Sequence, residues 1–405
     1  MRRFLIGLSG GFVLGYAAKR TFDALADLAQ PAPALDPDPA AYGRLRRALM
    51  LSSMARSLAQ IGGAAYGLGP LIEPANSNPQ GRARRVASIG AALLLSSAID
   101  LPSDFVEGHV LERRYALSKQ PAPAWAVDQA KSFAVTLAIT VPLIELLATA
   151  VERAPRTWPA LATAAAFPLL VLANVVAPSL IAPLFNRFEP IEGELEQRLR
   201  HLAARYGAGD AKILRVDMSR QTEKANAYVT GLLGSKRIVV GDTLLDHFEG
   251  PEIGFVVAHE LGHYVARDVW RSVAAGTAAT ALVFFGAAKF AGEPGRSLAT
   301  AAGIGRIFFV GSALGIAAGP LIAAFSRSRE RAADRFAIAA TGDRQAGVAA
   351  FTRLRERNMA EEDQPRWMEL LFSTHPSLGR RIERLRNGAA RPEVAEPPPN
   401  STPTP

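Results

Sequence analysis

Apolar stretches of about 20 residues recur along this chain, and they constrain its fold more than any other feature. They lie near residues 49–72, 86–102, 132–151, 158–185, 272–288 and 307–325. Most of them are long enough to cross the hydrocarbon core of a bilayer as a helix. Because so many recur, buried helices of a water-soluble core are a poor explanation, and we expect a mostly α, polytopic helical membrane protein.

The N-terminus carries a shorter apolar stretch. Met1, Arg2 and Arg3 precede apolar residues 4–18, whose length falls between that of a signal peptide and that of a span. Since other spans follow, we interpret residues 1–48 as an anchor or first span plus a Pro- and Ala-rich linker. The expected total is then about six to seven transmembrane helices.

Composition restricts the partners and the chemistry. The formal charge of +9 could indicate nucleic acid, but Lys and Arg are dispersed, so we expect no nucleic-acid partner. We attribute the charge to the cytoplasmic flanks of the spans, where Lys and Arg collect. The chain has no cysteine, which excludes disulfides, thiolate ligands and a cysteine nucleophile. A metal site must therefore use His, Asp and Glu.

Residues 186–271 differ in character from the spans. A charged helical pattern runs from Glu192 to Tyr206, and alternating stretches follow around Ile213–Val216 and Ile238–Val240. These patterns predict a water-facing α+β segment. The apolar pair in 272–325 is expected to form a transmembrane hairpin that returns the chain to the same face. The predicted parts are 1–48 (anchor and linker), 49–185 (spans), 186–271 (α+β core with a β-hairpin), 272–325 (hairpin of spans), 326–388 (a helix and the C-terminal part of the same domain) and 389–405 (disordered tail).

The strongest chemical signal is His259-Glu260-Leu261-Gly262-His263. Two imidazoles four residues apart project from one helical face, where both can bind one ion. Zinc needs a third protein ligand and a position for water, and Glu260 can take a proton from that water. The pattern therefore predicts a zinc site with Glu260 as the general base. Three histidines without such partners are expected at the surface: His109, His201 and His247.

A third ligand is expected just after the last apolar stretch. Glu330 and Asp334 lie four residues apart on one helical face. Glu330 would complete a two-histidine, one-carboxylate site. Asp334 could accept the outer N–H of a ligand histidine, and Arg327 is expected to support the ligands from the preceding turn. Because arginines surround these residues, a solvated helix with Glu–Arg pairs remains an alternative.

Two further segments could serve the same site. His375, in a loop before Pro376, could donate a hydrogen bond to the oxyanion of a tetrahedral intermediate, although an ordinary loop histidine would look the same. Residues 226–231 and 236–240 form two β-prone stretches joined by a Gly-containing turn, which predicts a hairpin. Its edge could bind an extended peptide through Asn226, Ala227 and Tyr228, or the hairpin could merely pack the site.

Taken together, these segments resemble the type I CAAX prenyl endopeptidases, which are integral-membrane zinc metallopeptidases of the gluzincin type. The resemblance extends from about Asp104 to Leu385. Its segments are Ala182–Phe188 with Pro190 and Glu192, Asn226–Tyr228, Lys236–Leu245, His259–His263, Ser326–Asp334 and His375-Pro376.

The resemblance implies His259, His263 and Glu330 as ligands of one zinc ion, Glu260 as general base and Asn226–Tyr228 as the substrate-binding strand. It also implies a ring of helices around a water-filled chamber, which would explain polar residues such as Arg56 and Glu145 in apolar stretches. The implied partners are the lipid bilayer and a peptide or protein substrate, with C-terminally prenylated motifs as the family substrate. We expect a bacterial inner-membrane protein whose catalytic face is cytoplasmic.

Other functions fit parts of the same sequence. A heat-shock type membrane protease of broad specificity shares the zinc core but lacks the Phe185-Asn186 region. A transporter with a structural zinc ion would have equally apolar spans, but a closed structural site has no use for Glu260 as a base. A catalytically inactive scaffold is disfavoured because ligands and base are all present.

Overall fold

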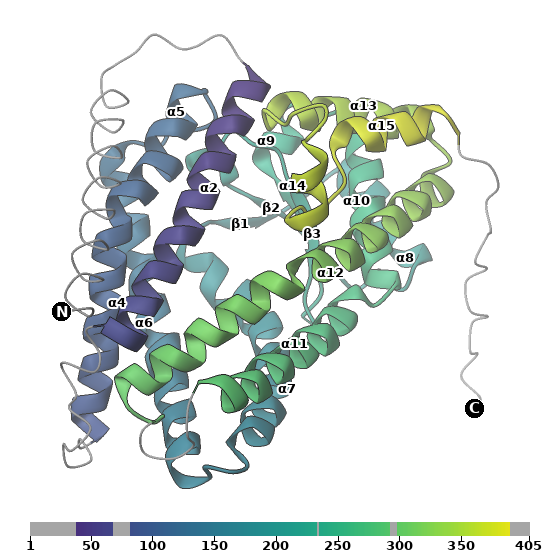
Figure 1. Cartoon of the computed structure of the whole chain (residues 1–405). Coiled ribbons are helices and arrows are strands. Elements are labelled where there is room, and N and C mark those ends of the chain that lie inside the picture. The colour runs from purple at the N-terminus through teal and green to yellow at the C-terminus, as the bar shows by residue number, and fades with distance from the viewer. Residues whose placement is uncertain (1–37, 68–81, 233–234, 292–297, 389–405) are drawn as a thin grey trace, which may run out of the picture.

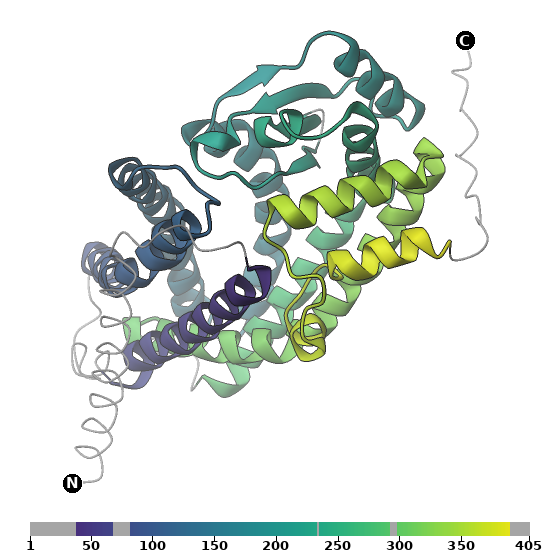
Figure 2. The same cartoon turned by 90° about the horizontal axis from the view of Figure 1, so that it is seen from above.

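The computed structural model describes residues 38–67, 82–232, 235–291 and 298–388. Long helices form most of the molecule, and a small sheet lies behind the crossing helices in the view of Figure 1. Seen from above, the sheet and its helices form one layer, and α2 (Pro39–Gly62) runs on the opposite side of the molecule (Figure 2). The expected anchor at 1–18 and the expected disordered tail at 389–405 lie outside the described residues.

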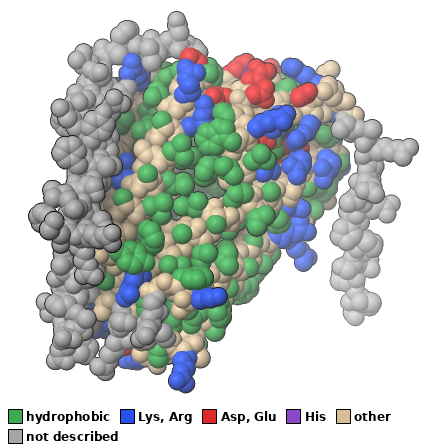
Figure 3. Space-filling view, in the orientation of Figure 1, with side chains coloured by type: hydrophobic (Ala, Val, Ile, Leu, Met, Phe, Trp, Pro, Cys, Tyr) green, Lys and Arg blue, Asp and Glu red, His purple; other side chains and the backbone are tan. Residues whose placement is uncertain are grey.

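Five helical segments of the described chain are long and apolar enough to cross a membrane. Short π and 3-10 turns extend two of them. After α4 (Arg82–Phe105) come η2 (Val106–Leu111) and α5 (Glu112–Arg114), and after α7 (Trp158–Val176) come η3 (Ala177–Ile181) and η4 (Ala182–Leu184). The five helices are α4 (Arg82–Phe105), α6 (Ala122–Arg153), α7 (Trp158–Val176), α11 (Asp268–Phe290) and α12 (Ala301–Thr341). In Figure 3, apolar side chains cover much of the visible face, and many charged ones gather over α13 (Arg344–Arg357) and α15 (Leu378–Arg386).

Five candidate spans lie in the described part of the chain, and the six to seven expected included a first span within residues 1–18, outside that part. The expected span at 49–72 falls on α2 and the π turn η1 (Gly63–Gly67). Arg56 is the one charged residue among residues 49–67, and the helix is not one of the five candidate spans. Residues 39–48, expected in the linker, are helical because the Asp38 side chain accepts hydrogen bonds from Ala40 and Ala41 and Pro39 occupies the first turn.

The longest helix joins the membrane part to the candidate site. We expected the hairpin to end near residue 325 and a separate helix to follow, but α12 continues through this boundary for 41 residues. The run of Arg327, Arg329 and Arg331 marks the end of the apolar stretch without ending the helix. The helix ends at Thr341, where Gly342 adopts a left-handed conformation with φ of 69°.

The water-facing segment forms a four-stranded sheet in the order β1-β2-β4-β3. Its strands are β1 (Phe188–Pro190), β2 (Lys212–Val216), β3 (Ala227–Thr230) and β4 (Arg237–Gly241). β3 and β4 pair in antiparallel fashion, which confirms the predicted hairpin, and β2 pairs with β4 in parallel. The helix α8 (Glu194–Arg205) confirms the charged helical pattern. β3 lies at the edge of the sheet, with one side unpaired by other described strands.

Two polar residues within the apolar stretches are held by ion pairs between helices. Arg56 of α2 donates to Asp100 of α4 over 2.6 Å. Glu145 of α6 accepts two hydrogen bonds of 2.7 Å from Arg85 of α4. Both residues therefore have charged partners on a neighbouring helix.

One histidine was placed wrongly from sequence. His109 is buried and stacks on Phe105, with ring centroids 5.0 Å apart, because the π turn η2 directs it inward. His201 and His247 are exposed, as predicted.

Candidate metal centre

The helix α10 (Gly250–Val265) carries both histidines of the HELGH pattern. It begins with a capping box in which Glu249 and Glu252 satisfy each other's backbone N–H groups. Its apolar side packs under the sheet: Val257 and Leu261 share a core cluster with Ala227 of β3. This packing fixes the opposite side of α10, so that His259 and His263 face α12.

Gly262 lets α12 approach α10 closely. A Cβ atom at this position would lie 3.1 Å from the Cα of Ala333 and 3.2 Å from the Phe336 side chain. Such a contact would push the two helices apart. Since Glu330 is three residues before Ala333 on α12, the glycine between the two histidine ligand candidates determines how near the Glu330 carboxylate can come.

The structure brings the three predicted ligands together. One donor atom from each of His259, His263 and Glu330 lies within 4.8 Å of the others. The Nε2 atoms of His259 and His263 lie 3.3 Å from the Oε2 and Oε1 atoms of Glu330, respectively. The His259 and Glu330 side chains are buried, with 7% and 6% exposure.

These residues fit a zinc ion. Ligand atoms about 2.0–2.1 Å from a tetrahedral ion lie about 3.3–3.4 Å from one another, which matches both of the nitrogen–oxygen distances just given. The Oε2 atom of Glu330 is buried without a hydrogen-bond partner in the described part of the chain. A buried carboxylate oxygen left in this way is expected to bind a cation or a proton.

Carboxylates bind the outer nitrogens of both histidines. The Nδ1 atom of His259 lies 3.0 Å from Asp334, as the spacing of Glu330 and Asp334 predicted. The Nδ1 atom of His263 lies 2.9 Å from Asp268, the first residue of α11. Each contact fixes the ring so that Nε2 faces Glu330, the arrangement commonly found for histidines that bind metals.

Arg381 of α15 completes the buried cluster. Its guanidinium donates to both oxygens of Asp334 over 2.6 and 3.1 Å and lies 3.6 Å from Glu330. It also stacks over the Phe351 ring, with its central carbon 4.0 Å from the ring centroid. Arg381 therefore offsets part of the negative charge of the two carboxylates and holds the C-terminal helix on the site.

The protonation of the histidines reflects this negative environment. Burial and the charge of Arg381 lower the pKa of His259, but the adjacent carboxylates of Asp334 and Glu330 outweigh them and raise it to about 9. Burial raises the pKa of Glu260, which the charges of His259 and His263 partly offset. The field that favours a proton on His259 also favours a metal cation, and a carboxylate with a raised pKa is a better proton acceptor.

His375 reaches the group from a different segment. Its Nε2 lies 3.2 Å from the Oε1 of Glu330, and its side chain is 63% exposed. Arg327, expected beside the ligands, instead donates to the backbone carbonyl oxygens of Glu369 and Ser373. It thus anchors the loop that carries His375 to α12.

The predicted substrate strand lies next to the metal group. β3 packs against α10, with Ala227 buried, Tyr228 half-buried and Asn226 exposed just before the strand. Asn358 fixes the approach to this strand: its side chain accepts from Ala225 N over 2.8 Å and donates to Ala225 O over 3.1 Å.

Sequence reasoning missed Asp268, Arg381 and Asn358. Asp268 follows His263 by five residues, beyond the end of α10, where Arg267 in a left-handed conformation redirects the chain. Arg381 follows His375 by six residues on a strongly amphipathic helix. An acidic residue just after the HELGH helix was a usable signal for Asp268, but no local pattern indicates the long-range contacts of Arg381 and Asn358.

Comparison with known proteins assigns the chain to a family. The model for peptidase family M48 matches residues 191–389, which include every residue of the metal group. A second model, described as the CAAX prenyl protease N-terminal region with five membrane helices, matches residues 45–187. The chain belongs to peptidase family M48. It is a membrane metalloprotease of the CAAX prenyl protease branch, as predicted, and M48 membership implies a metal, typically zinc.

Relatives of this M48 protein include bacterial and eukaryotic proteins. The uncharacterized metalloprotease YhfN of Bacillus subtilis is 29% identical over 310 residues, 74% of this chain and 72% of YhfN. CAAX prenyl protease 1 of Saccharomyces cerevisiae is 33% identical over 204 residues, 50% of this chain and 45% of the yeast protein. The crystal structure of S. mikatae Ste24p superposes with a TM-score of 0.73 at 24% identity, covering 93% of this chain and 96% of that one. The last comparison shows a shared fold.

Proposed function

We propose that this M48 protein is a zinc-dependent endopeptidase that hydrolyses peptide bonds of C-terminally prenylated substrates. The observation that supports it most directly is the convergence of His259, His263 and Glu330, with donor atoms within 4.8 Å, around a helix that also presents Glu260. A structural site would not need that carboxylate. In this proposal residues 49–185 and 272–325 form the membrane part, and 186–271 and 326–388 form the peptidase.

Each residue near the group has a role in this proposal. His259, His263 and Glu330 hold one zinc ion, which when bound supplies a Lewis acid and lowers the pKa of water. Glu260 accepts the proton of the attacking water and later returns it to the leaving amine. His375 donates a hydrogen bond to the oxyanion of the substrate, and Arg327 holds its loop.

Substrate binding is assigned to the edge of the sheet. The unpaired side of β3, from Asn226 through Ala227 and Tyr228, can accept an extended peptide as an added strand. The two hydrogen bonds of Asn358 to Ala225 keep this edge in place on α10.

Substitution of the general base tests the mechanism. Glu260→Gln keeps the size of the side chain but accepts no proton, so peptide hydrolysis should fall by about two to four orders of magnitude. Zinc content, measured by elemental analysis of the purified protein, should equal that of the parent. Glu194→Gln, which changes an exposed carboxylate of α8, is the matched control and should keep full activity. Hydrolysis within about threefold of the parent would place the base elsewhere.

The substrate class needs a separate test. Mass spectrometry of products from a peptide panel, with and without a farnesylated C-terminal cysteine motif, should show cleavage dependent on the lipid. Equal cleavage of both sets would favour the broad-specificity role of a heat-shock type protease.

We also place the protein in a bacterial inner membrane, with the peptidase part in the cytoplasm. The α11–α12 pair returns the chain to the side it left, and Lys and Arg are expected on the inner side. Reporters inserted within residues 292–297 and fused after residue 388 should give opposite signals. The same signal from both would contradict a spanning pair.

A further inference from the structure

Residues 222–226 lead into β3 without regular secondary structure, and neighbouring elements hold them in place. The backbone oxygen of Leu117, in the connector between α5 and α6, accepts from Thr222 Oγ1 over 3.2 Å and from Glu223 N over 2.8 Å. Asn358 holds the other end through the two hydrogen bonds described above. Because the segment has no helix or ladder of its own, these contacts determine where β3 begins.

Lys224, in the middle of this segment, forms a triad with Glu112 of α5 and Tyr42 of α2. Its ammonium group donates to Glu112 Oε2 over 2.7 Å and to the phenol oxygen of Tyr42 over 2.9 Å. The phenol donates in turn to Glu112 Oε1 over 2.6 Å. Tyr42 and Glu112 are buried, with 6% and 8% exposure. Since each group binds the other two, the triad connects the segment before β3 to both α2 and α5.

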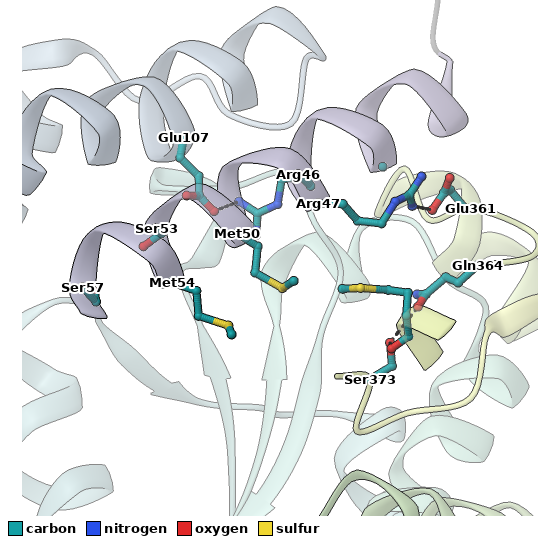
Figure 4. Close-up of a pocket in the computed structure, with 12 residues that line it drawn as sticks. Arg46, Arg47, Met50, Ser53, Met54, Ser57, Glu107, Glu361, Gln364 and Ser373 are labelled. Carbon is teal, nitrogen blue, oxygen red and sulfur yellow. Dashed lines mark hydrogen bonds and ion pairs between the residues drawn. The ribbon is translucent and has the colours of Figure 1, made fainter. Parts of the chain in front are cut away.

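The helix that carries Tyr42 is itself held on two sides (Figure 4). Arg46 donates to Glu107 of η2 over 2.8 Å, and Arg47 forms an ion pair with Glu361, which follows α13. Both arginines lie between one and two helical turns beyond Tyr42. The phenol is therefore a fixed partner for the flexible side chain of Lys224.

An apolar cluster surrounds the same junction. Its buried members are Tyr42, Leu111, Tyr115, Leu117 and Met359. The rings of Tyr42 and Tyr115 meet edge to face, with centroids 5.1 Å apart. The cluster joins α2, the end of η2 and the turn after α13, and it keeps water away from the triad, which strengthens the hydrogen bonds between its charged groups.

Backbone strain occurs at the same places. Three non-glycine residues of the described chain have positive φ angles: Ala116 (55°), Arg267 (53°) and Met359 (51°). Ala116 precedes Leu117, and Met359 follows Asn358, so two of them adjoin the residues that hold the ends of the segment. The third precedes the carboxylate that binds one histidine of the metal group. Strained conformations of this kind persist mainly at functional sites, where the surrounding structure holds them.

We infer that Tyr42, Glu112 and Lys224 are positioning residues that hold the substrate strand in its binding conformation before the peptide arrives. The inference rests on the proposed function, in which Asn226–Tyr228 binds the peptide, and it adds three residues outside the metal group. Without the triad, the free strand adopts that conformation only part of the time, and the apparent affinity falls by the same fraction. Once the peptide is bound, the geometry at the metal centre is unchanged, and so is kcat.

Lys224→Met tests the triad in the full-length protein in detergent micelles, with a peptide from the panel above that the parent cleaves. It removes the ammonium group and keeps the apolar stem. KM should rise by about tenfold, as expected for the loss of a charge-assisted hydrogen bond. The values of kcat and of zinc per chain should stay within about twofold of the parent. Lys224→Arg keeps the charge and the donors, and should restore KM to within about threefold.

Lys119→Met is the matched control. Lys119 forms an ion pair of 2.9 Å with Glu223 of the same segment, but its side chain is 79% exposed. Exposed pairs contribute little, so KM should stay at the parent value. A merely structural role of Lys224 would reduce the amount of folded enzyme and leave KM unchanged, which would overturn the inference. A fall in kcat at unchanged KM, or a KM of Lys224→Arg as high as that of Lys224→Met, would also overturn it.

Hydrogen exchange of the peptide-free protein gives a second measurement that does not depend on hydrolysis. Amides of residues 225–230 should exchange about tenfold faster in Lys224→Met than in the parent, while those of α10 keep their rates. Equal exchange rates in 225–230 would overturn the inference. A parent protein that cleaves no peptide of the panel would overturn the proposed function, whereas the exchange rates would still show whether the triad holds the strand.

Discussion

Two buried groups of charged side chains hold helices together in this protein, and they differ in how completely their carboxylates are bound. In the membrane part, both oxygens of Glu145 accept hydrogen bonds of 2.7 Å from Arg85. In the peptidase part, the Oε2 of Glu330 has no hydrogen-bond partner among the described residues. The two carboxylates are equally inaccessible, with 4% and 6% exposure.

The difference separates a structural ion pair from a binding site. A bidentate guanidinium satisfies Glu145 completely, so that pair needs nothing further and connects α4 to α6. Glu330 is surrounded by three imidazoles and by Arg381 at 3.6 Å, at distances that leave room for an ion. Burying a carboxylate in this way is unfavourable until a cation binds. Burial therefore does not distinguish the two groups, whereas the convergence of Glu330 with His259 and His263 does.

Replacing Glu330, whose Oε2 has no hydrogen-bond partner among the described residues, should have the largest effect of the four changes. Glu330→Gln should weaken zinc binding by more than about a thousandfold, beyond the 10–100-fold typical of residues that only support a ligand. Competition with a chelator of known affinity measures this change. His375→Ala should keep zinc binding within about tenfold of the parent, since the imidazole is assigned to the substrate. Equal losses of zinc affinity in the two variants would indicate that His375 is a fourth ligand, which leaves no open position for water.

Breaking the Arg85–Glu145 ion pair should lower the stability of the protein and leave zinc binding unchanged. Glu145→Ala leaves Arg85 without its main partner, and loss of one member of a buried pair costs about 3–5 kcal/mol of stability. Thermal unfolding in detergent should show the loss, while zinc bound per folded chain stays at the parent level. Glu194→Ala, an exposed member of a surface pair, should cost less than about 1 kcal/mol. Zinc loss from folded Glu145→Ala protein would contradict the separation of the two groups.

A smaller loss of zinc affinity is expected when Asp268, the partner of His263, is replaced. Asp268→Asn removes the negative charge that orients this imidazole, and zinc affinity should fall by about 10–100-fold. The same chelator competition measures it. Asp210→Asn, at a 61% exposed carboxylate of the peptidase part, should leave the affinity unchanged. An unaltered affinity in Asp268→Asn would show that packing alone holds the ring.

The smallest effect concerns the substrate strand. Asn358→Ala removes two hydrogen bonds to Ala225, so KM for peptide should rise by several-fold, in line with about 1 kcal/mol for a hydrogen bond. Because the metal group is untouched, zinc content and kcat should remain near the parent values. A fall in kcat with an unchanged KM would argue against a role in positioning the strand.

Much of this site could be predicted because its signals are local. The spacing of His259 and His263, and of Glu330 and Asp334, follows from the periodicity of a helix and needs no tertiary information. The hairpin around Gly231 could also be predicted, because its two β-prone stretches and its turn are adjacent in the sequence. The supporting residues were not, because Arg381 lies 47 residues from Asp334 along the chain and Asn358 lies 133 residues from Ala225.

The errors in the fold also have physical causes. The arginines after Phe325 resemble the end of a helix, yet α12 continues, because a helix can leave the membrane and enter water without a break. The start of α2 depends on the cap at Asp38, which a reading of apolar stretches does not consider. His109 was misplaced because a π turn changes which face of the helix it occupies.

The unbroken course of α12 determines how far the candidate metal centre lies from the apolar stretch of the same helix. Glu330 lies five residues beyond Phe325, about 7–8 Å along the helix axis. One continuous helix therefore carries both an apolar stretch that could cross a membrane and the Glu330 carboxylate, which would move with any tilt of that helix. In the proposed function, a substrate anchored in the bilayer would present to this centre only the peptide bonds near its anchor. The distance along α12 from the membrane surface to Glu330 would then select the bond that is cleaved.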